Sequence, residues 1–243
     1  MAKKIRLDIF LVENGLSESR SRAAAYIMEG KVTVDGCCAT KPGFLVGCLQ
    51  KIEVDKREDF VSRGGWKLKK AVDEFHIKVA GKICMDIGAS TGGFTDCLLK
   101  NGAKKVYCVD VGYGLLDFKL RNDPRVVNIE RTNIRYFDAK TIKEPVDLLA
   151  VDVSFISLEK VIPKVAEIAK KGGEIVLLVK PQFEAPRGKT KKGVVRDESV
   201  RSDTISKIQG VAESLGLEYI GGVDSPIKGP KGNLEHLLYL RKI

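Results

Sequence analysis

The sequence has 243 residues, 44% hydrophobic and 30% charged, which is typical of a globular protein with material for one large and one small domain. Lysine and arginine outnumber aspartate and glutamate by 42 to 32, and the net charge of +10 indicates a polyanionic partner, with nucleic acid the first candidate. The absence of a signal-peptide core, and of any apolar run of ~18 residues, argues against a secreted or integral membrane protein and favours the cytoplasm.

The cysteine and histidine pattern argues against a metal site. The six cysteines form no C-x-x-C pair, and His76 and His236 lie far from most of them in sequence. We therefore expect no zinc. Several cysteines stand within apolar runs, so we expect free thiols that behave as small hydrophobic side chains in a reducing compartment.

Residues 1–59 are predicted to form a compact α+β unit. The expected elements are a helix over 6–13, a helix from Ser17 or Ser19 to Gly30, strands around 32–34 and 52–54, and a turn at Asp35-Gly36. Arg20 and Arg22 fall in the first turn of the second helix, where the helix macrodipole disfavours cations. Because such departures often mark functional positions, an external phosphate is a candidate for the missing negative charge.

The rest of the chain, residues 60–243, is predicted to alternate strands with helices. Residues 56–64 are charged and are predicted to be a linker, followed by a helix over 65–75. Continuous apolar runs then predict buried parallel strands at 83–87, 106–109, 126–129, 148–153 and 175–179, with helices near 94–101, 115–122 and 157–170. This rhythm predicts a doubly wound α/β sheet of the Rossmann-like type. The basic stretch 185–196 is predicted to be a mobile loop.

The segment from Asp86 to Phe94, DIGASTGGF, is the most specific motif. A buried strand leads directly into a glycine-rich turn and then a helix, and Asp110 ends the next strand, where a carboxylate can bind ribose hydroxyls. The turn lacks the G-x-G-x-x-G of pyrophosphate binders, and no Gly-Lys-Ser/Thr of a P-loop follows. The motif therefore favours S-adenosylmethionine over a dinucleotide. Asn133, after the following strand, is a candidate for an adenine contact or is a plain turn residue.

Polar residues at strand ends form the candidate catalytic group. Asp152 and Lys180 each close an apolar run, and Glu235 stands between a glycine-rich turn and a final apolar strand. Lys67, in SRGGWKLKKA, is added to them. A charge beside a buried strand is costly unless it is paired, so these four are expected to form a catalytic cluster, or else a plain ion-pair network or individually solvated strand ends.

With these motifs in order, the whole chain resembles the FtsJ-like RNA 2′-O-ribose methyltransferases, specifically the TlyA family, some of whose members have the historical name haemolysin A. The pattern RLDIFLVENGL, SRSRA and GKVTVDG resembles the RNA-binding domain first named from ribosomal small-subunit protein four, and VSRGGWKL, DIGASTGGFTD, VDVSFISL, LVKPQFE and GPKGNLEHL follow as in that family. The resemblance implies a seven-stranded methyltransferase sheet, a Lys67-Asp152-Lys180-Glu235 catalytic tetrad and a ribosomal RNA cytidine as substrate. The position of Arg6 near the start resembles members specific for the large subunit.

The resemblance and the motifs together define the expected sites. The residues expected to bind S-adenosyl-L-methionine are Asp86, Gly88, Ala89, Ser90, Thr91, Gly92, Gly93, Phe94, Asp110, Val111, Asn133 and Asp152. Those expected to hold RNA phosphates are Arg6, Arg20, Arg22, Lys31, Lys189, Lys191 and Lys192. Lys180 is expected to contact the 2′-oxygen, either as a base or as a cation that steers it. We expect a monomer whose partner is ribosomal RNA or a ribosomal subunit.

Two other classes of function stay open at this point. One is a non-catalytic RNA- or ribosome-binding factor that keeps an inactive methyltransferase domain, against which the full set of strand-end residues argues. The other is a membrane-active haemolysin, against which the lack of a strongly apolar basic helix argues. A Rossmann dehydrogenase is disfavoured because the G-x-G-x-x-G motif is missing.

Overall fold

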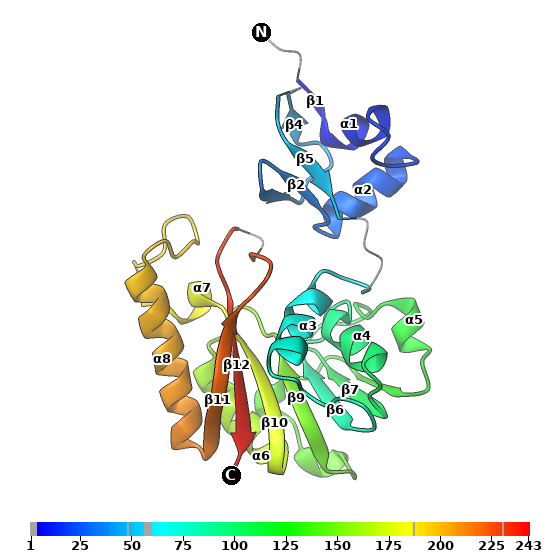
Figure 1. Cartoon of the computed structure of the whole chain (residues 1–243). Coiled ribbons are helices and arrows are strands. Elements are labelled where there is room, and N and C mark those ends of the chain that lie inside the picture. Colours follow the sequence, from blue (N-terminus) through cyan, green and yellow to red (C-terminus); the bar gives the residue numbers. More distant parts are fainter. Residues whose placement is uncertain (1–3, 48, 56–59, 187, 230) are drawn as a thin grey trace. The chain divides into compact units, whose positions relative to one another are not determined.

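The computed structural model of the chain describes residues 4–47, 49–55, 60–186, 188–229 and 231–243 (Figure 1). The chain divides into two compact units, one comprising the described residues of 1–59 together with Lys231 and Gly232, and the other comprising residues 60–229 and 233–243. Each unit has its own buried apolar core.

The first unit packs two helices against short antiparallel strands. Its elements are β1 Ile5–Arg6, α1 Leu7–Glu13, α2 Arg20–Met28, β2 Val32–Val34, β3 Cys37–Ala39, β4 Leu45–Val46 and β5 Ile52–Val54. Ser19 caps α2 by accepting a hydrogen bond from the backbone N–H of Arg22 at 3.2 Å. Of the two predicted capping residues, Ser17 and Ser19, the second is therefore the one used. Asp35 and Gly36 form a turn with φ of 50° and 76° between β2 and β3, which confirms the predicted turn.

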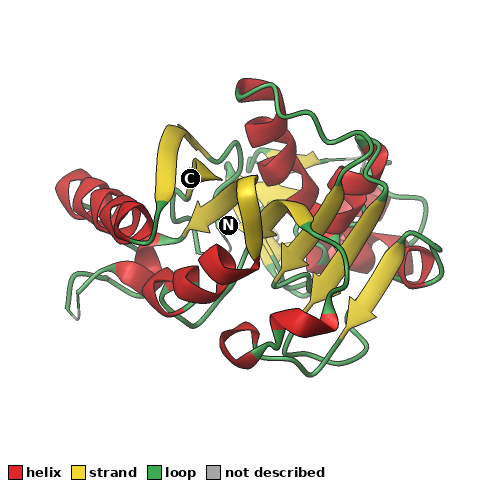
Figure 2. Cartoon of the chain, turned by 90° about the horizontal axis from the view of Figure 1, so that it is seen from below, coloured by secondary structure: helices red, strands yellow, loops and turns green. Residues whose placement is uncertain are grey.

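The second unit is built on a seven-stranded sheet of order β11-β12-β10-β9-β6-β7-β8 (Figures 1 and 2). The strands are β6 Ile83–Ile87, β7 Lys105–Val109, β8 Val126–Ile129, β9 Val146–Val151, β10 Ala169–Val179, β11 Leu217–Asp224 and β12 His236–Lys242. The α-helices are α3 Gly64–Glu74, α4 Gly93–Lys100, α5 Phe118–Arg121, α6 Ile162–Ile168, α7 Pro181–Glu184 and α8 Glu198–Ser214. Strands β8, β7, β6, β9 and β10 run parallel, whereas β12 is antiparallel to both β10 and β11.

Alternate residues of each central strand face two separate cores, because side chains along a strand point to opposite faces. Cys84 of β6 belongs to one core together with residues of α3 and α4. Its neighbour Met85 belongs to the other core, together with residues of α6 and α8. Figure 2 shows helices on both faces of the sheet. This arrangement confirms the doubly wound α/β fold predicted from the continuous apolar runs.

Some predicted bounds in the second unit are wrong. The helix expected over 115–122 is only α5, because Asp117 caps it at the backbone N–H of Lys119 while Leu116 packs into the core instead. The helix expected over 157–170 is a short 3-10 turn, Leu158–Lys160, followed by α6, and Ala169 already belongs to β10. Helix α8 and strand β11 were not predicted.

The linker predicted over 56–64 is also corrected in part. Residues 56–59 lie outside the described residues, but Phe60 is buried in the second unit and meets Trp66 edge to face at a centroid distance of 5.1 Å. Helix α3 already begins at Gly64, one residue before its predicted start. The stretch from Phe60 to Arg63 is therefore an anchored lead-in to α3 and not a linker.

None of the described helices combines the length and apolarity needed to cross a membrane. The five described cysteines are free thiols, and Cys48 lies outside the described residues. Burial raises the pKa of the Cys84 and Cys97 thiols to about 12, so both stay protonated and pack as small apolar groups.

Candidate active site

The candidate site lies where the sheet topology reverses. From β6 the chain adds β7 and β8 on one side and then β9 and β10 on the other, and such a switch point opens a crevice at the carboxyl ends of the strands. The turn after β6 passes close to the end of β9 there. A Cβ on Gly88, whose φ is +85°, would lie 2.4 Å from the carbonyl oxygen of Asp152. Only glycine permits this approach.

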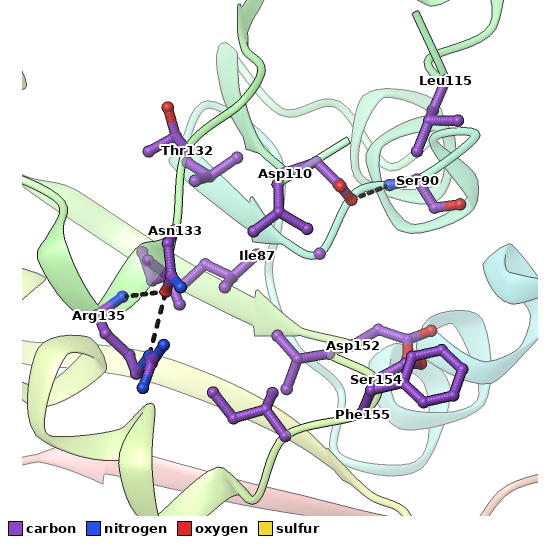
Figure 3. A pocket seen from close by; sticks show the side chains of 16 residues that line it. Ile87, Ser90, Asp110, Leu115, Thr132, Asn133, Arg135, Asp152, Ser154 and Phe155 are labelled. Carbon is purple, nitrogen blue, oxygen red and sulfur yellow. Dashed lines mark hydrogen bonds between the residues drawn. The ribbon is translucent and has the colours of Figure 1, made fainter. Parts of the chain in front are cut away.

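Asp110, at the end of β7, organises two loops beside this turn. Its Oδ2 accepts the backbone N–H of Ser90 at 2.8 Å (Figure 3), and its Oδ1 accepts that of Gly112 at 2.7 Å. Each carboxylate oxygen can accept more than one hydrogen bond. Asp110 therefore fixes the glycine-rich turn and keeps acceptor capacity for a ligand.

A cavity of about 550 Å³ opens between these strand ends (Figure 3). Its lining residues are Ile87, Gly88, Ser90, Val109, Asp110, Val111, Leu115, Thr132, Asn133, Ile134, Arg135, Asp152, Val153, Ser154, Phe155 and Ile156. The lining joins apolar side chains to two carboxylates and an arginine. Its volume suits a nucleoside-sized small molecule.

The predicted cofactor residues divide into two groups. Those that line the cavity are Gly88, Ser90, Asp110, Val111, Asn133 and Asp152. Those that do not line it are Asp86, Ala89, Thr91, Gly92, Gly93 and Phe94. Phe94, for example, is 3% exposed and belongs to the core beneath α3 and α4.

Asp86 is buried beneath the turn and does not reach the cavity. Its side chain is fully buried, and its Oδ2 accepts both the backbone N–H of Thr95 at 2.9 Å and the Thr95 hydroxyl at 2.7 Å. The Oδ1 atom has no hydrogen-bond partner among the described residues. Burial raises the pKa of Asp86 to about 7, because the charged form is poorly solvated there. Asp86 therefore fixes the start of α4.

Asn133 caps the short 3-10 turn Ile134–Tyr136 at the cavity wall. Its Oδ1 accepts the backbone N–H of Arg135 at 3.1 Å and the Arg135 Nε–H at 3.3 Å (Figure 3). The side chain therefore does act as a turn residue. Its Nδ2 group is the donor that is left for a ligand.

Two lysine–carboxylate pairs stand beside the cavity. Lys180, 8% exposed at the end of β10, forms an ion pair with Asp152 and donates to the Ser154 hydroxyl at 2.8 Å. Lys67 of α3 donates to Glu235 at 2.6 Å, and these residues are 6% and 1% exposed. All four predicted tetrad residues are thus engaged in ion pairs with one another.

Gln182 connects the two pairs. It stands two residues after Lys180 in α7, and its Nε2 donates to Glu235 Oε1 at 3.4 Å. Lys180 and Glu235 are therefore joined by the chain from 180 to 182 and one side-chain hydrogen bond. Gln182 and Phe155 also line a second cavity of about 670 Å³, which shares Arg135, Phe155 and Ile156 with the first.

Three buried polar residues hold the loops around these pairs. Asp96 of α4 accepts the backbone N–H of Val61 at 2.7 Å, ahead of α3. Glu184 accepts the Ser157 hydroxyl at 2.6 Å and the Leu158 N–H at 2.7 Å, and burial raises its pKa. Asn233 donates to the Gly193 carbonyl and accepts the Val195 N–H, both at 2.9 Å, and so holds the base of the basic loop.

Sequence reasoning missed Ser154, Phe155, Gln182 and Asn233. Phe155 is the most unusual, since its side chain is 92% exposed and its φ is +62°, a conformation that few non-glycine residues adopt. Its ring lies 5.2 Å from that of Phe183. The segments VDVSFISL, LVKPQFE and GNLEHL pointed to this neighbourhood, but no local pattern reveals a left-handed phenylalanine.

The predicted RNA-binding residues lie in the two separate units. Arg6 and Arg20 have side chains 45% and 60% exposed and both pair with Asp8. Lys31 is mostly covered and pairs with Glu29 at 2.9 Å, and the Arg22 guanidinium lies 4.8 Å from the Tyr26 ring centre. Lys189, Lys191 and Lys192 are exposed on the basic loop. Among the described residues no cluster suited to a metal ion occurs.

Comparison with known proteins gives close relatives over most of the chain. The FtsJ-like methyltransferase pattern matches residues 60–242, and the S4 domain pattern matches residues 5–47. The chain is 46% identical over 244 residues to the 16S/23S rRNA (cytidine-2′-O)-methyltransferase TlyA of Mycobacterium tuberculosis, which covers 99% of this chain and 91% of that protein.

Two further relatives extend this finding. The 23S rRNA (cytidine-2′-O)-methyltransferase TlyA of Campylobacter jejuni is 37% identical over 187 residues, 76% of this chain and 72% of that protein. A solved structure from Streptococcus thermophilus, provisionally described as a hemolysin, is 40% identical with a TM-score of 0.78 and covers 100% of this chain and 90% of that chain.

Proposed function

The chain belongs to the FtsJ-like methyltransferase family, within its TlyA group, and on that premise we propose that it transfers the methyl group of S-adenosylmethionine to the 2′-hydroxyl of a cytidine in ribosomal RNA. The observation that supports this most is the pairing of Lys180 with Asp152 at the cavity, joined through Gln182 to the buried Lys67–Glu235 pair. Large-subunit RNA is the proposed substrate, since the names of both relatives include 23S.

The cavity fits S-adenosylmethionine by the chemistry of its walls. The close contact of Gly88 with Asp152 leaves the cavity floor free of a side chain, and Asp110 offers carboxylate oxygens to ribose hydroxyls. Val111 and Leu115 offer apolar surface to an adenine ring, and the Asn133 Nδ2 group can donate to its edge. The two carboxylates in the lining suit a ligand with a cationic sulfur and an ammonium group.

The proposed role of each tetrad residue follows from its contacts. Bound S-adenosylmethionine supplies a methyl group on a positively charged sulfur, which is a strong electrophile. Lys180, oriented by Asp152 and Ser154, would contact the 2′-oxygen and either accept its proton or stabilise the charge that develops on it. Lys67 and Glu235 would bind the target ribose and hold its oxygen in line with the methyl group.

Recognition of the RNA is proposed to be shared between the units. The arginines of the first unit would bind backbone phosphates of the RNA, and the basic loop of the second unit, with Lys189, Lys191 and Lys192, would bind phosphates near the reaction. Exposed Phe155, at the edge of both cavities, offers a ring against which an unpaired base can stack.

The test of this function is the Lys180→Ala variant. Single-turnover methyl transfer to ribosomal RNA should fall by about 10²–10⁴, the usual contribution of a positioned acid or base, while affinity for S-adenosylmethionine changes little. Lys170→Ala is the matched control, because Lys170 also belongs to β10 and pairs with Asp147. A Lys180→Ala rate equal to that of the wild type would remove Lys180 from this role, and a failure of the wild-type chain to bind S-adenosylmethionine would indicate a non-catalytic factor.

A further inference from the structure

The first unit contains a buried carboxylate that links two of its arginines. The Asp8 side chain is 4% exposed and pairs with Arg6 and Arg20, whose side chains are 45% and 60% exposed. Arg6 donates from Nε and Nη2 to the two carboxylate oxygens at 3.0 Å each, and Arg20 donates from Nε to Oδ2 at 2.9 Å. The arginine contacts hold the pKa of Asp8 at about 2, so the carboxylate is ionised at neutral pH.

The shared oxygen sets the spacing of the two guanidinium groups. The nitrogens of Arg6 and Arg20 that bond Asp8 Oδ2 cannot be more than about 6 Å apart, because each lies within hydrogen-bond distance of that one atom. Two guanidinium groups at this spacing repel each other unless an anion lies between them. Asp8 is that anion on the protein side.

Arg20 keeps both terminal nitrogens for a ligand, and Arg6, which bonds Asp8 through Nε and Nη2, keeps Nη1. Arg20 uses only its Nε toward Asp8, and neither of its terminal nitrogens has a partner among the described residues. The Arg6 guanidinium lies against Gly43, where a Cβ would come within 3.2 Å of Nη1, so a side chain there would press on it. Planar N–H groups held in a fixed orientation match the oxygens of a phosphate.

A negative charge is unexpected on a surface that binds a polyanion, unless it has a positioning role. Asp8 cancels one of the two positive charges beside it and so weakens the long-range attraction for RNA. We propose that Asp8 is a positioning residue that holds Arg6 and Arg20 as a two-arginine clamp for a single phosphate of the RNA backbone. The inference depends on the proposed function, since that function supplies RNA as the ligand. The clamp also explains why Arg20 is tolerated in the first turn of α2, because the Asp8 carboxylate provides part of the negative charge that the helix macrodipole favours there.

The test is whether Asp8→Asn in the full-length chain tightens or weakens the binding of RNA. The substitution raises the net charge by one, so simple electrostatic attraction predicts tighter binding of RNA. The clamp predicts weaker binding, because asparagine is uncharged and has one acceptor oxygen in place of two, so at least one of the three arginine hydrogen bonds is replaced by an NH₂ group that faces a donor. The probe is the large ribosomal subunit purified from cells that lack this protein, titrated at two salt concentrations. We expect the affinity to fall by roughly threefold to tenfold and the slope against log salt to decrease by about one phosphate contact.

Matched variants make this outcome specific. Glu18→Gln removes one negative charge from an exposed side chain of the same unit and should leave the affinity equal or slightly higher. Arg20→Ala should weaken binding, and adding Asp8→Asn to it should have little further effect, because the two changes act on one contact. Equal or tighter binding by Asp8→Asn, or fully additive effects, would overturn the clamp.

A second variant keeps the inference testable if Asp8→Asn fails to fold. Arg20→Lys changes an exposed side chain and keeps its charge, but the ammonium cannot bond Asp8 and a phosphate with a planar array of donors. It should therefore weaken binding nearly as much as Arg20→Ala, and full affinity in Arg20→Lys would contradict the clamp. If the wild-type chain shows no salt-dependent binding to the subunit, the proposed function itself fails.

Discussion

The contact between the glycine-rich turn and α3 can be tested with one methyl group. Gly93 begins α4, and a Cβ built on it would lie 2.4 Å from the Ser62 hydroxyl and 2.9 Å from the backbone nitrogen of Gly65. Its φ is not left-handed, so an alanine there meets a problem of space alone. Ordinary contacts need about 3.4–4 Å, and the Gly93→Ala variant must therefore move the start of α3 by about 0.5–1 Å.

This displacement acts on Lys67, which stands two residues after Gly65 on the same helix. The 2.6 Å bond from Lys67 to Glu235 would lengthen or bend. Overpacking of this kind costs about 1–3 kcal/mol of stability, and a misplacement approaching 1 Å costs up to about 10²-fold in rate. We expect Gly93→Ala to unfold more easily and to methylate RNA roughly tenfold to 100-fold more slowly.

Two assays measure these effects. Urea denaturation followed by fluorescence reports on α3 directly, because the single tryptophan of the chain is Trp66. Single-turnover methyl transfer to ribosomal RNA reports the rate. The control is Gly210→Ala in α8, where a Cβ would meet no described atom within 4 Å and should stabilise the chain by up to about 1 kcal/mol.

A partial rescue would identify the cause. Ser62→Ala removes the nearest atom, so the double variant Ser62→Ala/Gly93→Ala should recover part of the lost stability and rate. If Gly93→Ala matches the wild type in both assays, α3 is not held at a fixed distance from the turn, and the reasoning that links the turn to Lys67 is refuted.

Two more predictions concern buried polar residues. Because the pKa of Asp86 is raised to about 7, the folded chain binds that proton more tightly than the unfolded chain does. The free energy of unfolding should therefore fall as the pH rises from about 4 to about 7, by at most about 4 kcal/mol. Asp86→Asn should lack this fall in urea titrations, and parallel pH profiles of the variant and the wild type would contradict the prediction. Asn233→Ala should leave the Gly193 carbonyl and the Val195 N–H unpaired and lower the free energy of unfolding by about 1–3 kcal/mol. Trypsin should then cleave the lysine-rich loop roughly tenfold faster. Unchanged cleavage would show that Asn233 does not hold this loop.

The sheet could be predicted from the sequence because its central strands are buried on both faces. The run 83–87 contains almost only apolar residues, and such a run has few alternatives to a parallel strand. Helix α8 was missed because its buried positions, among them Val200, Ile208 and Ala212, are diluted by polar residues over 17 positions. Its apolar stripe is too narrow to be recognised without the sheet that it covers.

The sequence was enough to predict which strand-end residues form the site, but not how their side chains pair. Asp152 and Lys180 were recognised because each follows an apolar run, whereas their pairing depends on β9 and β10 being neighbours. The inward orientation of Asp86 could have been found, since it lies two residues after Cys84 and must face the same helix layer. The Asp8 pairing could not, because it joins residues 12 positions apart across two helices.

The order of the strands has a consequence for the time at which activity arises during synthesis. Strand β12 is the last strand along the chain, yet it occupies an interior place between β10 and β11, and Glu235 directly precedes it. A nascent chain that has not yet released residues 236–242 from the ribosomal exit tunnel leaves β10 without its neighbour and Lys67 without its carboxylate. We therefore expect a chain still in synthesis to lack the arrangement proposed for methyl transfer until its final strand has left the tunnel.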